Sequence, residues 1–134
     1  MSAPDPNLKQ IVLEALVARP GIQLAIIFGS IAKGAERSNS DLDLAVEAAQ
    51  DLTATEKLSL ISELATRIGR PVDLVDLRTA GEPLLGMILK HGTRILGANA
   101  SYARLLRRHL FDGADFLPYR QRILRERRLA WIGK

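Results

Sequence analysis

The sequence predicts an α/β fold of the α+β kind: a small mixed β-sheet with helices packed on one face, followed by C-terminal helices. Two observations predict this class. Along residues 5–97, segments with helical periodicity alternate with short strand-like segments, which are either apolar throughout or alternate apolar and polar residues. The chain has 134 residues and 47% hydrophobic content, which suits one domain with a sizeable core. No repeat or linker interrupts it, so we expect a single domain over residues 1–134.

A helix, a strand and a short helix are expected first. Asp5 and Pro6 have the form of an N-cap and a first helical residue, and apolar residues follow at helical spacing until the Pro-Gly pair at 20–21. The apolar run from Leu24 to Phe28 predicts a strand. A short helix can begin at Ser30, directly after it.

The middle of the chain predicts two strands, two helices and an edge strand. Alternation predicts a strand that starts at Asp41, and Thr53 with Glu56 forms a capping-box pattern before the next helix. The remaining elements are a strand within Arg70 to Leu77, a helix from Gly81 to His91 that Gly92 can end, and a short strand from Thr93 to Leu96.

The most informative motif is Gly29-Ser30 followed, after a ten-residue spacer, by Asp41-x-Asp43. Asp41 and Asp43 are two apart on a strand, so their carboxylates point the same way and can share a cation. Magnesium prefers such hard oxygen ligands and completes its shell with phosphates and water. Gly29 lets a ligand approach the main chain, the Ser30 hydroxyl adds a donor, and Lys33 adds positive charge. We therefore expect a nucleoside triphosphate at this turn.

This pattern resembles the nucleotidyltransferase domain of the DNA polymerase beta superfamily. Its spacer and small size are similar to the minimal nucleotidyltransferases, antitoxins that pair with HEPN-domain toxins. The resemblance covers about residues 22–97 and implies two Mg²⁺ ions, or Mn²⁺, with ATP as the substrate. It further implies a hetero-oligomer in which AMP passes to a tyrosine of the HEPN ribonuclease. Two positions depart from the common family pattern: Ile31 stands where a basic residue often follows Gly-Ser, and Lys33 stands where arginine is frequent. Both changes would weaken contacts with phosphate.

The resemblance also implies a third carboxylate, for which the segment from Arg70 to Leu77 offers Asp73 and Asp76. Alternation puts the two side chains on opposite faces of a strand, so periodicity leaves both open. The resemblance favours Asp73, because the family places this residue early in the strand beside Asp-x-Asp. Asp76, near the strand end, then has a solvated or capping role. The implied catalytic and metal-binding set is Asp41, Asp43 and Asp73.

The basic charge of the chain belongs to its C-terminal tail, about residues 101–132. Residues 101–134 hold 9 Lys or Arg and 3 Asp or Glu, whereas residues 1–100 hold 10 and 12. Apolar residues alternate with arginines there, which predicts two amphipathic helices. Their arginines can simply face solvent, or they can bind an acidic protein or RNA. Nucleic acid is weakly supported because only 4% of the chain is aromatic.

The composition excludes some kinds of site, and neither histidine adds a metal site. There is no cysteine, so disulfides and thiolate metal sites are excluded. Neither a signal-peptide pattern nor a membrane-length apolar run is present, and we expect a cytoplasmic protein without a membrane partner. His91 and His109 lack metal-ligand spacing, and the Arg104-x₄-His109 match to HEPN ribonucleases is a coincidence. Two alternatives stay open: an inactive antitoxin that sequesters its partner, and an RNA 3′-end nucleotidyltransferase.

Overall fold

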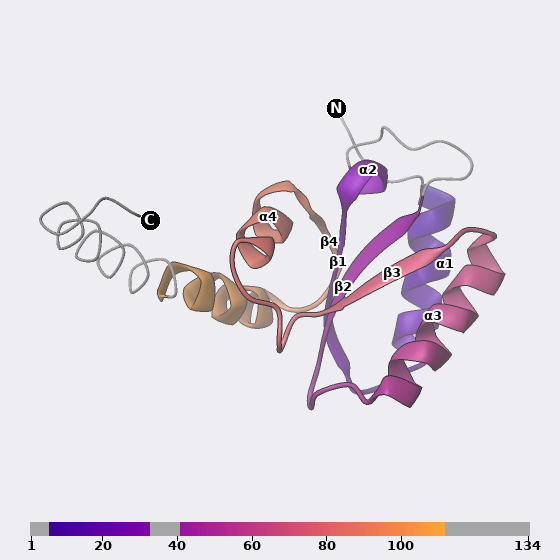
Figure 1. The fold of residues 1–134 in the computed structure, drawn as a ribbon, viewed down its shortest axis with the longest axis horizontal. Coiled ribbons are helices and arrows are strands. Elements are labelled where there is room, and N and C mark those ends of the chain that lie inside the picture. Colours follow the sequence, from indigo (N-terminus) through magenta and orange to yellow (C-terminus); the bar gives the residue numbers. More distant parts are fainter. Residues whose placement is uncertain (1–5, 33–40, 112–134) are drawn as a thin grey trace, which may run out of the picture.

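The computed structural model describes residues 6–32 and 41–111 of the chain. Within these ranges the helices and strands follow one another in the predicted order (Figure 1). The elements are α1 (Pro6–Val17), β1 (Ile22–Phe28), α2 (Gly29–Ala32), β2 (Leu42–Ala48), α3 (Ala54–Ile68), β3 (Val72–Asp76), α4 (Leu84–His91) and β4 (Thr93–Leu96). One more helix covers residues 99–111. The predicted N-cap Asp5 and the second tail helix lie outside the described residues.

The four strands form one mixed sheet in the order β3-β2-β1-β4. β1 runs antiparallel to both β2 and β4, whereas β2 and β3 are parallel. A parallel pair needs a crossover connection, and α3 supplies it between β2 and β3. This confirms the predicted mixed sheet.

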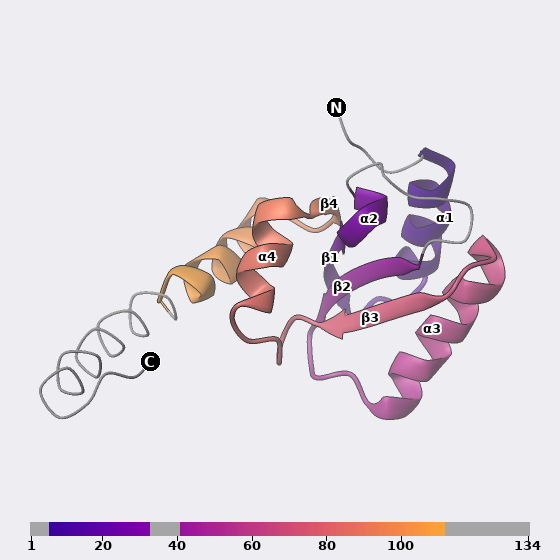
Figure 2. The same cartoon turned by 45° about the horizontal axis from the view of Figure 1, so that its top comes forward.

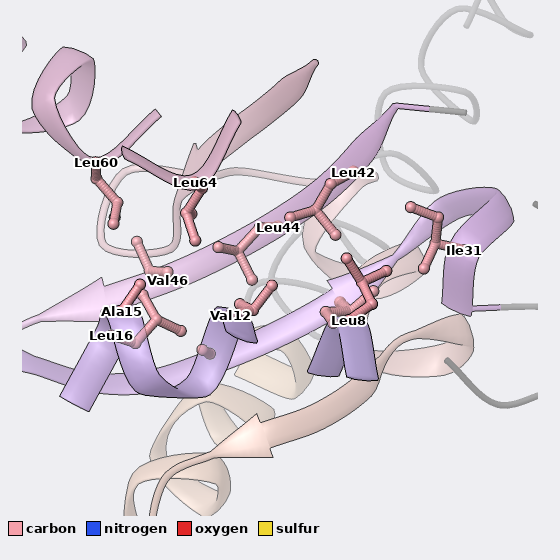
Figure 3. Close-up of a cluster of buried hydrophobic side chains, with 12 residues drawn as sticks. Leu8, Val12, Ala15, Leu16, Ile31, Leu42, Leu44, Val46, Leu60 and Leu64 are labelled. Atoms are coloured by element: carbon pink, nitrogen blue, oxygen red, sulfur yellow. The ribbon is translucent and has the colours of Figure 1, made fainter. Parts of the chain in front are cut away.

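α1 and α3 cover the first face of the sheet (Figures 1 and 2). Leu42, Leu44 and Val46 are two apart on β2 and point together toward these helices, as Figure 3 shows. The other fully buried members of this cluster include Val12, Ala15 and Leu16 of α1, Ile31 of α2, and Leu64 of α3. Burying a leucine or valine side chain of this kind contributes about 1.5–3 kcal/mol.

The second face of the sheet is also covered, by α4 and by the helix at residues 99–111 (Figures 1 and 2). The prediction that helices pack on one face only was therefore wrong, although the fold class is confirmed. The reason lies in β1, which is apolar from Leu24 to Phe28 and therefore has apolar side chains on both faces of the sheet that must be covered. Leu24, Ile26 and Phe28 pack with Leu85, Ile88 and Leu105 on this second face.

Local signals at the helix ends act as predicted. The Glu56 amide donates to Thr53 Oγ1 at 3.1 Å, and the Thr53 amide donates to Glu56 Oε1 at 2.8 Å, which completes the capping box of α3. Gly69 ends α3 with a φ of 70°, and Gly92 follows the last residue of α4. α4 begins at Leu84, three residues after the predicted Gly81. Across residues 6–32 and 41–111, no helix combines the length and apolar character needed to cross a membrane.

Candidate active site

One edge of the sheet brings the motif residues together. β1 ends there at Phe28, and β2, β3 and β4 all begin there, because β1 is antiparallel to β2 and β4 while β2 is parallel to β3. Gly29 and α2 follow directly after β1, and Asp41 directly precedes β2. Segments separated by more than 40 residues therefore meet at a single edge.

Asp43 lies at the centre of this edge. It pairs with Phe28 of β1 on one side and with Asp73 of β3 on the other. Because Leu42 and Leu44 point into the first-face core, the Asp43 side chain points to the second face, as does Phe28. Neighbouring strands lie about 4.8 Å apart, so the carboxylates of Asp43 and Asp73 are adjacent.

The strand register separates Asp73 from Asp76, which periodicity left open. Asp73 shares the second face with Val75 and Leu77, beside Asp43. Asp76 lies on the opposite face, where only 5% of its surface is exposed. Its two carboxylate oxygens accept hydrogen bonds from the backbone amides of Leu52 at 3.3 Å and Arg78 at 3.0 Å. Asp76 therefore has a structural role, holding together the loops that follow β2 and β3.

The electrostatics of the edge couple its three carboxylates. Burial raises the pKa of the Asp43 carboxyl above its ordinary value, and the negative charges of Asp73 and then Asp41 raise it further. These nearby negative charges disfavour the ionised form of Asp43. A cation at this edge would offset that repulsion.

The donor set fits a magnesium ion that is shared with a nucleotide. Among residues 6–32 and 41–111, no three acidic, histidine or cysteine side chains converge closely enough to coordinate one metal ion by themselves. Mg²⁺ rarely requires such a cage, since it keeps several waters and takes phosphate oxygens alongside one or two carboxylates. Asp43 and Asp73, with Asp41 beside them, supply carboxylates of this kind.

Gly29 leaves the space that the Asp43 carboxylate occupies, because glycine has no side chain. Its φ is 75°, a left-handed conformation that glycine adopts without strain. A Cβ at Gly29 would overlap Asp43 Oδ2 and would lie 3.0 Å from Asp43 Cγ. The Gly29 backbone and the Asp43 carboxylate are thus in direct contact, which ties the Gly-Ser turn to the Asp-x-Asp strand.

The other residues of the turn are only partly described. Ser30 lies in α2, next to Gly29, and Lys33 lies outside the described residues. Ile31, where the family pattern often has a basic residue, is fully buried in the first-face core and anchors α2 there. The side chain at this position therefore packs inward, away from the ligand edge.

Sequence reasoning did not assign Lys90 and His91 to this edge. Thr93 pairs with Ile27 near the end of β1, so the end of α4 lies close to Gly29. α4 also packs on the second face, to which Asp43 and Asp73 point. Lys90 and His91, both at least partly exposed, occupy this end of α4. The signal that indicates them is their position just before the strand that pairs with β1.

The profile of the family described as polymerase beta, nucleotidyltransferase matches residues 10–101. That stretch includes the Gly-Ser turn and all three carboxylates of the edge. It ends at the third residue of the helix at 99–111.

Relatives of known description agree with this match. The chain is 38% identical over 78 residues to protein adenylyltransferase MntA of Shewanella oneidensis. The aligned stretch covers 58% of this chain and 56% of that protein. It thus spans little more than half of that relative. A toxin–antitoxin crystal structure with AMP-PNP contains a chain that is 28% identical, with a TM-score of 0.77.

That likeness covers 88% of this chain and 96% of the other. A structure of a tri-AMPylated Shewanella oneidensis HEPN toxin with its MNT antitoxin matches at 26% identity and a TM-score of 0.72, over 90% of this chain and 95% of the other. Likenesses of this extent continue beyond residue 101, where the family match ends.

Proposed function

Because the chain belongs to the polymerase beta nucleotidyltransferase family, we propose that it transfers AMP from ATP to a tyrosine of a cognate HEPN ribonuclease toxin and so neutralises it. The observation that carries this proposal is the pairing of Asp43 with Asp73, at the edge where Gly29 contacts Asp43. We take residues 1–134 as one functional unit, with its catalytic core at about 22–97. Use of ATP would place the reaction in the cytoplasm.

The choice of acceptor follows the relatives. The Shewanella oneidensis relative is named a protein adenylyltransferase, and one matched structure contains an AMPylated HEPN toxin bound to its antitoxin. The proposal extends that activity and that partner to this chain, as a hetero-oligomer.

Asp41, Asp43 and Asp73 would hold the metal ions. Magnesium, when bound, neutralises charge on the triphosphate and makes the acceptor hydroxyl easier to deprotonate. Gly29, with the Ser30 hydroxyl and Lys33, would bind the outgoing phosphates. Lys90 adds positive charge from the α4 side of the same edge, where His91 lies next to it.

The reaction needs one proton acceptor and an in-line approach. The tyrosine oxygen attacks the α-phosphorus, a new P–O bond forms, and the bond to the β-phosphate oxygen breaks to release pyrophosphate. Asp73, which is exposed on the edge strand β3, would take the proton from the tyrosine hydroxyl. Asp43, which is partly buried, would help to hold the metal ion that neutralises the reacting phosphate group.

Neither alternative function is favoured by an observation. Ile31, whose departure from the family pattern argued for weak nucleotide binding, has a packing role in the core. An RNA 3′-end transferase would use the tail as a basic footprint. In the described part of that tail, however, Arg108 and His109 contact the protein itself.

The test is intact-protein mass spectrometry of the cognate HEPN protein after incubation with this chain, ATP and Mg²⁺. We expect the mass of the partner to rise by one or more AMP units. The Asp41→Ala, Asp43→Ala double variant should give no increase, whereas Asp51→Ala, an exposed carboxylate 64% accessible beyond the far end of β2, should act as wild type.

Two outcomes would overturn the proposal. One is an unchanged partner mass with the wild-type chain. The other is full neutralisation of the ribonuclease by the double variant, which would identify a binding-only antitoxin. Transfer to an RNA 3′ end under the same conditions, with the partner unmodified, would identify the third function.

A further inference from the structure

The helix at residues 99–111 is attached to the core by both apolar and polar side chains, and Tyr102 packs beside Leu105 on the second-face cluster. Arg108 donates to the carbonyl oxygen of Ala80 at 2.9 Å, and His109 Nδ1 lies 2.6 Å from Glu82 Oε2. Arg104 lies 3.8 Å from Glu47 on β2. Leu105, which is 1% exposed, is the fully buried apolar residue between them. This side of the helix faces α4 and the sheet (Figure 1).

The opposite side of the helix leaves large apolar residues in solvent. Leu106, Leu110 and Phe111 are 39%, 60% and 61% exposed. At 3.6 residues per turn they share one side of the helix with Ala103 and Arg107, both exposed. We call these five residues the outer stripe: Ala103, Leu106, Arg107, Leu110 and Phe111.

This arrangement departs from the usual pattern of a surface helix. The polar side chains of Arg108 and His109 make contacts within the protein, whereas two leucines and a phenylalanine face outward. Contiguous exposed apolar side chains on a folded protein mark interaction sites. The internal contacts hold the helix in place, so the outer stripe is a preorganised surface.

Two observations indicate what kind of molecule covers it. The catalytic family match ends at residue 101, whereas the likeness to chains of toxin–antitoxin complexes continues past it. The helix therefore lies in a stretch that this chain shares with chains of toxin–antitoxin complexes and that extends beyond the family profile. Arg107 is exposed within the outer stripe, and its positive charge complements a carboxylate on a partner.

We propose that the outer stripe is the docking surface for the protein acceptor, which presents an apolar helix face bordered by carboxylates. The identity of the partner rests on the proposed function, in which it is the cognate HEPN protein. Leu106, Leu110 and Phe111 insert between apolar side chains of the partner, and Arg107 pairs with an acidic residue at the border. Docking there leaves the carboxylate edge free for ATP.

The experiment compares matched leucine variants of the full chain. Leu110→Glu and Leu58→Glu introduce the same charge at helix positions that are 60% and 66% exposed, but Leu58 lies on α3, across the sheet. Affinity for the purified HEPN protein is measured by titration calorimetry, and ATP affinity is measured on the same samples. We expect Leu110→Glu to weaken partner binding about 100-fold, as loss of a central interface residue does. Leu58→Glu and ATP binding should stay unchanged.

The outcomes separate this inference from the proposed function. If Leu110→Glu binds the partner as wild type while AMP transfer continues, the docking surface is wrong and the activity stands. If the stripe variant loses binding but the wild type transfers no AMP, the surface stands and the activity is wrong. A wild-type chain that forms no complex with the HEPN protein overturns both.

Two other occupants are checked in the same samples. Wild-type dimers that Leu110→Glu dissociates, measured by light scattering, would show that a second copy covers the stripe. Low carbene labelling of Leu106, Leu110 and Phe111 in a free monomer would show that the chain covers its own stripe. Either result overturns the assignment to a partner protein.

Discussion

Replacing Gly29 by alanine tests the contact between the Gly-Ser turn and the Asp-x-Asp strand. The added Cβ would overlap Asp43 Oδ2 and would lie 3.0 Å from Cγ, whereas ordinary Cβ contacts begin at 3.4 Å. The carboxylate must therefore move by about 1 Å, and a misplacement of this size costs roughly 100-fold in rate. We expect the transfer rate of Gly29→Ala to fall by at least that factor.

Gly69→Ala is the matched control for backbone strain. Gly69 has a φ of 70°, close to the 75° of Gly29, but among the described residues beyond its chain neighbours no atom lies within 4 Å of the position that a Cβ would take. Both variants incur roughly 1–2 kcal/mol for a left-handed alanine, which lowers Tm by about 4–8 °C. Only Gly29→Ala displaces a carboxylate, so only it should lose activity beyond what the loss of stability explains.

The transfer rate is measured as AMP incorporation into the HEPN protein by mass spectrometry. Thermal unfolding of each variant is measured with and without Mg²⁺. Gly69→Ala should keep the wild-type rate and the wild-type response of Tm to Mg²⁺. Gly29→Ala should lose both. Equal transfer rates for the two alanine variants would refute the reasoning, because the contact with Asp43 would then have no functional consequence.

Three further predictions concern the same edge. Asp43→Asn should raise Tm of the metal-free chain at neutral pH, because the pKa of Asp43 is raised on folding. The protonated Asp43 carboxyl stabilises the folded state below the ordinary pKa of 3.8, and this stabilisation is lost as pH rises through the pKa of the folded state. The Tm difference from wild type should therefore vanish in acid, and a difference that persists there would contradict this cause. Asp73→Asn should abolish transfer without lowering Tm, because the change removes a negative charge that disfavours ionised Asp43. Asp76→Asn should instead lower Tm by weakening its two backbone hydrogen bonds, at about 1–3 kcal/mol, and should keep the transfer activity. The reverse result would exchange the roles of the two residues. Lys90→Ala should raise KM for ATP about tenfold, as expected for the loss of one charged hydrogen bond, whereas Lys57→Ala on α3 should not; equal KM values would remove Lys90 from the site.

Much of the fold could be predicted from the sequence, because its signals are local. The capping box of Thr53 and Glu56 and the apolar run of β1 depend on residues a few positions apart, and they predicted the order of the elements. The Gly-Ser and Asp-x-Asp motif likewise lies within one short segment, which is why the family was recognised. The roles of Ser30 and Lys33 stay predictions.

The tertiary structure decided what depends on contacts between distant segments. Periodicity shows that Asp73 and Asp76 face opposite ways, but only the parallel pairing of β2 with β3 shows that Asp73 lies beside Asp43. Lys90 reached the same edge only through the pairing of β4 with β1. The outer stripe was likewise hidden, since an amphipathic pattern does not reveal which side of a helix the core will use. Register and packing partners depend on residues far apart in the chain, and a sequence pattern read locally leaves them undetermined.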